Sequence, residues 1–240
     1  MNRLATVGLL GGMSWESTAT YYRLVNEGVR ERAGGLHSAP LLIWSADFAE
    51  IEELQRTGDW PAAAEILAGA AVRLEYAGAA AIALCTNTMH RVAEVIRGRL
   101  AVPLLSMVDV VGAHAAGEGW TRVGLLGTAF TMDSPMYPDA MAAHGIEVLT
   151  PPAEDRGLVH RVIYDELCQG VIRGGSRQAY RRIIRDLVAR GAQAVVLGCT
   201  EISMLVGPAD AEVPLPDTTA LHAAAIVDFA LQHSLTGAGR

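Results

Sequence analysis

Three short motifs recur in the second half of the chain, in the same order and at nearly the same separation. The segment Val-Gly-Leu-Leu-Gly occurs at residues 7–11 and 123–127, Cys-Thr at Cys85 and Cys199, and Val-Pro-Leu at residues 102–104 and 213–215. The three separations all lie between 111 and 116 residues. One such match would carry little weight, but three in order indicate an internal duplication. The chain is therefore expected to fold as two similar halves.

Within each half, short apolar runs alternate with longer segments of helical periodicity, which predicts βαβ units and parallel sheets. The predicted strands are residues 5–10, 41–45, 79–84, 103–106, 122–126, 147–149, 194–197 and 214–215. The predicted helices include residues 17–32, 60–76, 89–100, 134–143, 155–168 and 178–190. Gly78 and Gly191 directly follow two of these helices, where a glycine commonly ends a helix.

We therefore expect an α/β fold of two similar Rossmann-like lobes, each with a parallel sheet, related by pseudo-twofold symmetry. The first lobe is predicted to comprise residues 1–110 and 217–240, and the second residues 111–216. The last helix, residues 221–232, would pack on the first lobe. Because ligands of open α/β sheets bind at the carboxyl ends of strands, an active-site cleft is expected between the lobes.

Composition excludes several classes of protein. The 240 residues carry a net charge of −7, which argues against a nucleic-acid partner, because phosphate binding needs clustered Lys and Arg. Three cysteines without a C-x-x-C pair, and scattered histidines, support neither a disulfide framework nor a metal site. We find no secretory signal and no apolar stretch long enough to span a membrane. These features predict a cytoplasmic protein.

Cys85 and Cys199 are the strongest candidates for chemistry. Each follows a predicted buried strand and precedes polar residues that begin a helix, where free N–H groups stabilise a thiolate. A single cysteine in such a run is more often a small buried hydrophobe, and the duplication reverses that interpretation. Cys168 lies in a helical pattern without this context, and we interpret it as structural or incidental.

Two equivalent thiols suit inversion at a carbon atom, in which one removes a proton and the other delivers one to the opposite face. Acyl transfer by a Cys/His pair is less consistent with the sequence, because no matching histidine follows either motif. The glycines at positions 8, 11 and 12 do not fit a dinucleotide fingerprint. They are expected to turn the chain sharply, so that Met13 and Ser14 point at the cleft.

Polar residues near the two thiols fit a carboxylate ligand. Thr86, Asn87 and Thr88 offer donors at a helix start, Thr128 and Thr131 follow the repeated glycine turn, and Thr200 echoes Thr86. Each of these residues is equally suited to capping a helix. As a convergent set they favour substrate binding.

The motifs resemble those of the aspartate/glutamate racemase family. The resemblance rests on residues 8–14 with Thr18, on residues 85–90, and on residues 198–201, and it runs almost the whole chain. It implies a cofactor-independent amino-acid racemase, usually a homodimer, with Cys85 and Cys199 as the base/acid pair. It also implies that Asn87, Thr88 and Thr200 hold the α-carboxylate.

The chain departs from two branches of that family. Glutamate racemases have Asp-Ser at the first turn and a His after the second Cys-Thr pair, where this chain has Met13-Ser14 and then Glu201-Ile202. Aspartate racemases place an Arg and a Lys where this chain has residues 45–48 and 166–169, which contain neither. The pattern is closer to broad-specificity racemases. Hydantoin racemisation, maleate-type isomerisation and a non-catalytic binding role stay open as alternatives.

Overall fold

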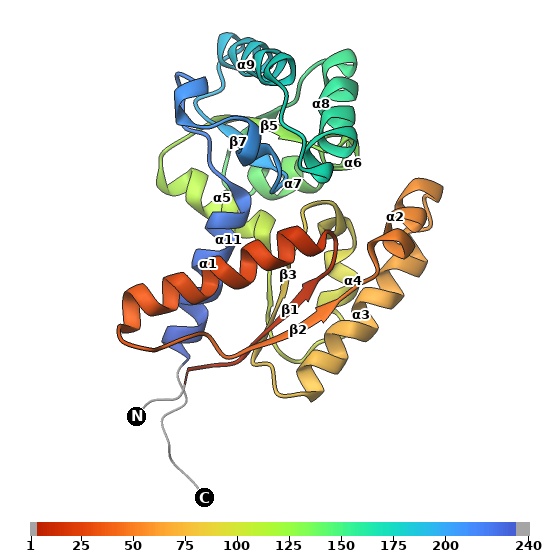
Figure 1. Ribbon diagram of the computed structural model, residues 1–240, viewed down its shortest axis with the longest axis vertical. Coiled ribbons are helices and arrows are strands. Elements are labelled where there is room, and N and C mark those ends of the chain that lie inside the picture. Colours follow the sequence, from red (N-terminus) through yellow and green to blue (C-terminus); the bar gives the residue numbers. More distant parts are fainter. Residues whose placement is uncertain (1–3, 234–240) are drawn as a thin grey trace, which may run out of the picture. The chain divides into compact units, whose positions relative to one another are not determined.

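Parallel strands form two separate sheets in the computed structural model, which describes residues 4–233 (Figure 1). The first sheet has the order β2-β1-β3-β4, with β1 at Val7–Gly11, β2 at Leu41–Ser45, β3 at Ala81–Leu84 and β4 at Leu104–Leu105. The second has the order β6-β5-β7, with β5 at Arg122–Gly127, β6 at Glu147–Leu149 and β7 at Val195–Gly198. Every neighbouring pair is parallel. The predicted α/β class with parallel sheets is confirmed.

The chain divides into two units with one sheet each. Among the described residues, unit 1 contains 4–107 and 222–233, and unit 2 contains 108–221. The helices that belong mainly to unit 1 are α1 (Trp15–Ala33), α2 (Phe48–Thr57), α3 (Trp60–Tyr76), the 3-10 helix η1 (Thr88–Val92), α4 (Ala93–Arg97) and α11 (Thr218–Gln232). Those of unit 2 are α5 (Met107–Gly117), α6 (Ala129–Met132), α7 (Met136–Ala142), α8 (Ala153–Asp165), η2 (Leu167–Gln169), α9 (Gly174–Ala189), α10 (Ile202–Leu205) and η3 (Pro208–Asp210).

In unit 1, α3 covers one face of the sheet with a surface of small side chains. Asp59 caps the helix by accepting a hydrogen bond from the Ala62 N–H at 3.1 Å. The buried residues of α3 are mostly alanines, so the helix can lie close to Leu10, Ile82 and Leu84 on the sheet. Because side chains alternate along a strand, the other face is left for α1 and α11. Figure 1 shows α1 and α3 on opposite sides of β1.

In unit 2, α9 packs directly on the central strand. A Cβ at Gly124 would lie 3.0 Å from Cδ1 of Leu187, so a larger residue there would push the Leu187 side chain away from the strand. Arg182 on α9 donates to Asp155 on α8, with Nη1 3.0 Å from Oδ2. This hydrogen bond lowers the pKa of the Asp155 carboxyl. Figure 1 shows α9 and α5 on opposite sides of β5 and β7.

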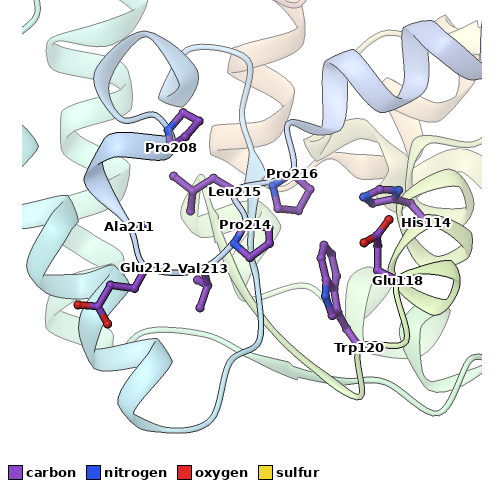
Figure 2. Close-up of a pocket in the computed structure, with 10 residues that line it drawn as sticks. All are labelled: His114, Glu118, Trp120, Pro208, Ala211, Glu212, Val213, Pro214, Leu215 and Pro216. Carbon is purple, nitrogen blue, oxygen red and sulfur yellow. The ribbon is translucent and has the colours of Figure 1, made fainter.

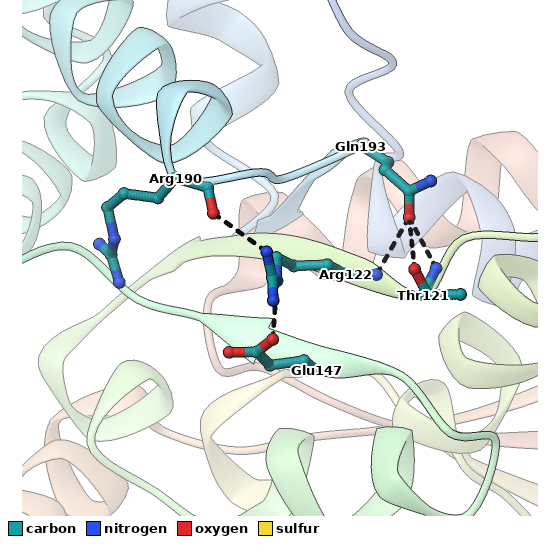
Figure 3. Close-up of polar contacts among 5 residues, drawn as sticks. All are labelled: Thr121, Arg122, Glu147, Arg190 and Gln193. Carbon is teal, nitrogen blue, oxygen red and sulfur yellow. Dashed lines mark hydrogen bonds and ion pairs between the residues drawn. The ribbon is translucent and has the colours of Figure 1, made fainter.

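Polar side chains tie together the amino ends of the strands in unit 2 (Figure 3). The Oε1 of Gln193, just before β7, accepts hydrogen bonds from the N–H groups of Thr121 and Arg122 at 2.7 and 3.1 Å. The Arg122 Nε donates to Glu147 at the start of β6 at 2.7 Å. These contacts fix the register of three strands at the edge opposite their carboxyl ends.

Two predicted elements are corrected by the structure. Residues 89–100 do not form one α-helix but η1 followed by the short α4, because His90 N–H bonds to Asn87 O in a 3-10 pattern. Residues 214–215 do not form a strand. Val195 and Leu197 of β7 donate to the carbonyls of Pro214 and Pro216, but a proline has no N–H to return the bond. Only an isolated parallel bridge, Leu197 with Asp217, remains there.

The predicted glycine positions after two helices are confirmed. Gly78 follows α3 with φ +99°, and Gly191 follows α9 with φ +98°. Residues other than glycine rarely adopt a positive φ of this size. Among residues 4–233, no helix combines the length and the apolar composition that a membrane span requires.

Candidate active site

In unit 1, a tight turn brings Met13 to the carboxyl edge of the sheet. Gly12 has φ +83°, and a Cβ there would lie 2.2 Å from the backbone N of Ala46. Thr18 fastens this turn, because its Oγ1 accepts from the Gly12 N–H at 2.7 Å and donates to Ser14 O at 3.0 Å. Met13, predicted as a substrate-binding residue, is 6% exposed and belongs to the core around α3.

Cys85 lies at the same edge, one residue beyond β3. Its N–H donates to Leu10 O of β1 at 2.9 Å, so the backbone of this residue is fixed to the sheet. The thiol is fully buried, and its Sγ lies 3.7 Å from Ala83 O. Burial raises the pKa of the Cys85 thiol well above the usual value. The resting form of Cys85 at neutral pH is therefore the thiol.

The residues after Cys85 lead into η1, with Asn87 at its N-cap and Thr88 as its first residue. Asn87 and Thr88 are buried and Thr86 is partly exposed. Asn87 occupies the N-cap position, but within the described chain its side chain makes no capping hydrogen bond to η1. The capping interpretation of Asn87 is therefore wrong. Substrate binding by Thr86, Asn87 and Thr88 stays a prediction.

In unit 2, Cys199 follows β7 and contacts an acidic side chain. Its Sγ donates to Glu201 Oε2 at 2.9 Å. Cys199 is partly exposed, and Glu201 is buried. Desolvation by the surrounding protein, followed by the charge of Glu201, raises the pKa of the Cys199 thiol well above its usual value. Cys199 thus differs from Cys85 in having a potential proton acceptor within hydrogen-bond distance.

Thr128 and Thr131 follow β5, next to the end of β7, because Gly127 and Gly198 are paired across the two strands. Thr128 caps α6, and its Oγ1 lies 3.2 Å from Thr131 Oγ1. Thr131 is fully buried. The Ala129 N–H donates to Nδ1 of His160 on α8 at 3.2 Å, which supports the same turn. Capping is observed for Thr128, whereas binding by Thr128, Thr131 and the partly exposed Thr200 stays a prediction.

The predicted site residues thus form two groups, one at the carboxyl edge of each sheet. Glu201 and His90 were given no role by sequence reasoning. Glu201 stands two residues after Cys199, a spacing that also fits an ordinary helix start. His90 ends the motif at residues 85–90, but its Nε2 contacts Met107, which is distant in the sequence. No local sequence pattern predicts a contact between His90 and Met107.

A groove of about 550 Å³ on unit 2 contains none of these residues (Figure 2). It is lined by His114 of α5, by Glu118 and Trp120 after that helix, and by residues of the segment from Pro208 to Pro216. Figure 2 shows the Trp120 indole beside Pro214. Because Trp120 precedes β5 and Pro214 lies beside the start of β7, the groove is at the amino edge of the sheet. Among residues 4–233, no three His, Cys, Asp or Glu side chains are arranged to bind a metal ion.

Comparison with known proteins places the chain in a family. The model of the Asp/Glu/hydantoin racemase family matches residues 10–226. The chain belongs to this racemase family. The resemblance inferred from the cysteine motifs is confirmed, and the matched region contains both Cys85 and Cys199.

Several members of the racemase family are similar over nearly the full length. A Yersinia pestis structure described as a "putative Asp/Glu racemase" is 50% identical, with a TM-score of 0.91 and coverage of 95% of this chain and 100% of that one. An aspartate racemase homologue from Pyrococcus horikoshii is 31% identical, with a TM-score of 0.83 and coverage of 96% and 100%. The broad-specificity amino-acid racemase RacX of Bacillus subtilis is 23% identical, with coverage of 95% and 99%.

Proposed function

We propose that this protein is a cofactor-independent amino-acid racemase in which Cys85 and Cys199 are the two acid/base groups. The observation that carries the proposal is the matched placement of two Cys-Thr pairs, each directly after a buried strand of its own parallel sheet. Membership of the racemase family supports the reaction class. Similarity to RacX, a broad-specificity amino-acid racemase, supports an amino acid as substrate.

The proposed reaction is a transfer of two protons at the α-carbon. One cysteine, as thiolate, takes the α-proton and becomes a thiol, and the bonding electrons stay on the α-carbon as a carbanion. The other cysteine, as thiol, gives its proton to the opposite face and becomes a thiolate. The product has the opposite configuration, and the enzyme has exchanged the roles of its two thiols. The reverse reaction uses the same two groups in the opposite order.

A thiolate must form before the first step, because the pKa of both thiols is raised in the free protein. Glu201 is the proposed acceptor for the Cys199 proton. Its Oε2 is 2.9 Å from Sγ, so the proton can move along an existing hydrogen bond. For the reaction that starts from the opposite enantiomer, we propose that the substrate ammonium group lowers the pKa of the Cys85 thiol when it binds and that this thiol, in place of Cys199, gives its proton to water, since a nearby positive charge favours the thiolate.

The α-carboxylate is proposed to bind to the polar residues beside the two cysteines. Asn87 and Thr88 follow Cys85, and Thr200 follows Cys199. Thr86 and Thr128 would complete the polar surroundings. Thr131 is proposed to hold Thr128 in place, because it is fully buried and its Oγ1 lies 3.2 Å from Thr128 Oγ1.

We propose a substrate range that is broader than acidic amino acids. Asp47 and Glu166 occur in the two segments where aspartate racemases are expected to have cations. Asp47 caps α2, and Glu166 accepts from Ser176 Oγ at 2.6 Å. Neither segment offers a positive group to an acidic side chain.

The test is a panel of L- and D-amino acids incubated with the protein without added cofactor and analysed by chiral chromatography. We expect inversion of several amino acids, including ones with neutral side chains. Because the family description includes hydantoin racemases, the panel should also contain 5-substituted hydantoins. Inversion of hydantoins alone would replace the proposed substrate class, and inversion of no compound would contradict the function.

A further inference from the structure

Two buried histidines in unit 1 have no role in the proton transfer proposed above. His90 of η1 is 6% exposed and His222 of α11 is fully buried. Their ring centroids are 6.3 Å apart with the rings nearly perpendicular. The usual interpretation of such residues is a core histidine with satisfied hydrogen bonds. The partners of His90 indicate a more specific role.

His90 connects the residue after Cys85 to the start of α5. Its Nδ1 lies 2.7 Å from Thr86 O, and its Nε2 accepts from the Met107 N–H at 2.9 Å. A carbonyl oxygen can only accept and a backbone N–H can only donate. The imidazole is therefore neutral, with its proton on Nδ1.

The 3-10 geometry of η1 makes this contact possible. In an α-helix the His90 backbone N–H would bond to Thr86 O, four residues earlier. Here that N–H bonds to Asn87 O at 3.0 Å, three residues earlier. The Thr86 carbonyl instead receives the side chain of His90. The 3-10 pattern thus leaves the Thr86 carbonyl without a backbone bond from His90, and the His90 imidazole bonds to this carbonyl in the turn after Cys85.

His222 also contacts residues 105–107, the segment by which the chain leaves unit 1 and which we call the exit segment. Its Nε2 lies 2.9 Å from Leu105 O, and its Nδ1 lies 2.9 Å from the Tyr21 hydroxyl. Since Leu105 O can only accept, Nε2 carries a proton; burial keeps the imidazole neutral, so Nδ1 accepts from the Tyr21 hydroxyl. The chain leaves unit 1 after Met107 and returns at His222. Residues 105–107 are therefore held by both imidazoles.

We propose that His90 is a positioning residue for Cys85: its Nδ1–H bonds to the Thr86 carbonyl and thereby fixes the turn that presents the thiol, while its Nε2 holds the Met107 N–H. The inference rests on the proposed function, because it assumes that Cys85 reacts with substrate. Loss of the Nδ1 contact releases Thr86 and displaces the thiol from its reacting position. Loss of the Nε2 contact releases only the exit segment.

Two substitutions separate the contacts. His90→Asn keeps a donor near the Nδ1 position but loses the acceptor for Met107, whereas His90→Gln keeps an acceptor near Nε2 but loses the donor to Thr86. We expect His90→Gln to lower kcat roughly 10- to 100-fold with little change in KM, since small displacements of reacting groups have effects of this size. His90→Asn should recover most of that loss. Equal kcat for the two variants would overturn the proposal.

The matched control is His233→Gln. His233 is exposed, and its Nδ1 also contacts a carbonyl four residues earlier, Phe229 O at 3.2 Å. The same substitution there should leave kcat and KM unchanged. If His90→Gln does not fold, His90→Asn decides alone, and a tenfold or larger loss of its kcat would overturn the proposal.

Alkylation of Cys85 distinguishes failure of this inference from failure of the proposed function. The rate of Cys85 modification by iodoacetamide, followed by peptide mass spectrometry, does not depend on knowing a substrate. The buried thiol should react at least about 3-fold faster in His90→Gln than in wild type, with His233→Gln unchanged. If the wild type racemises no compound, the proposed function fails, and unchanged Cys85 alkylation in His90→Gln would then overturn the positioning role as well.

Discussion

The Cys199 thiol donates a hydrogen bond to the buried carboxylate of Glu201, with Sγ 2.9 Å from Oε2. Cys85 is surrounded differently: its Sγ is fully buried and lies 3.7 Å from a backbone carbonyl. Two cysteines in matching sequence contexts thus occupy different electrostatic environments. In the free protein, burial and then the charge of the Glu201 carboxylate raise the pKa of the Cys199 thiol, and the same carboxylate is placed to accept the thiol proton.

These two effects of Glu201 predict opposite outcomes for Glu201→Gln. The amide cannot accept the thiol proton as a base, so kcat for racemisation should fall by about 100-fold, as for loss of a general base. Removal of the negative charge should also lower the pKa of Cys199, so the pH midpoint of its alkylation should move down. Steady-state kinetics and a pH series of alkylation measure the two effects. A higher kcat together with a lower pH midpoint of Cys199 alkylation would contradict the role of Glu201 as the base.

A second prediction concerns the turn at Gly12. Gly12→Ala adds a Cβ 2.2 Å from the Ala46 backbone, on top of the strain of φ +83°. Gly58 is the matched control, because it has φ +77° and no atom within 4 Å of the added Cβ. Gly58→Ala should reduce the free energy of unfolding by about 1 kcal/mol. Gly12→Ala should cost roughly 2 kcal/mol more, as overpacking does.

Urea unfolding of both variants measures this difference. The Gly12 variant should also lose activity, because Met13 and the neighbouring strand end would move. Equal losses of stability at the two positions would show that the close approach of Ala46 does not constrain the turn.

A third prediction is a loss of stability on acidification that depends on His222. Burial lowers the pKa of His222 to about 3 from the usual 6.5. The unfolded chain therefore binds this proton more readily than the folded one. The stabilisation is fully present above pH 6.5 and is lost as the pH falls toward 3. Between pH 7 and pH 5, this one group should reduce the free energy of unfolding by about 2 kcal/mol.

The measurement compares wild type with His222→Gln, which cannot titrate at this position. Other groups titrate in both proteins, so the difference between the two pH dependences isolates the histidine. Tyr21 and His90 face the ring and are unchanged in the variant. Parallel pH dependences would mean that His222 does not stay neutral in the folded protein.

The positions of the two cysteines could be predicted because a buried parallel strand has a strong local signal. The apolar runs before Cys85 and Cys199 do form β3 and β7, and each cysteine follows its strand directly. The family was also predictable, since its motifs are contiguous in the sequence. The loss of the strand at Pro214 was predictable in principle, because proline cannot donate a ladder bond.

Other features could not be predicted from the sequence. Over the few residues of η1, a 3-10 helix and an α-helix have similar sequence patterns. The sequence therefore does not show that the Thr86 carbonyl lacks the backbone hydrogen bond of an α-helix. The contact of His90 with Met107 joins segments that are distant in the sequence. Glu201 reads as a solvated residue at a helix start, and only the fold shows that it is buried against a thiol.

In the proposed mechanism, both cysteines transfer protons at one α-carbon. The direct measurement is incubation of a substrate enantiomer in D₂O with wild type, Cys85→Ala, Cys199→Ala and Cys168→Ala, following deuterium at the α-carbon by NMR and configuration by chiral chromatography. Wild type and Cys168→Ala should form the deuterated opposite enantiomer. Cys85→Ala and Cys199→Ala should each invert at least about 100-fold more slowly. Full racemisation by either of these two variants would contradict the two-cysteine mechanism.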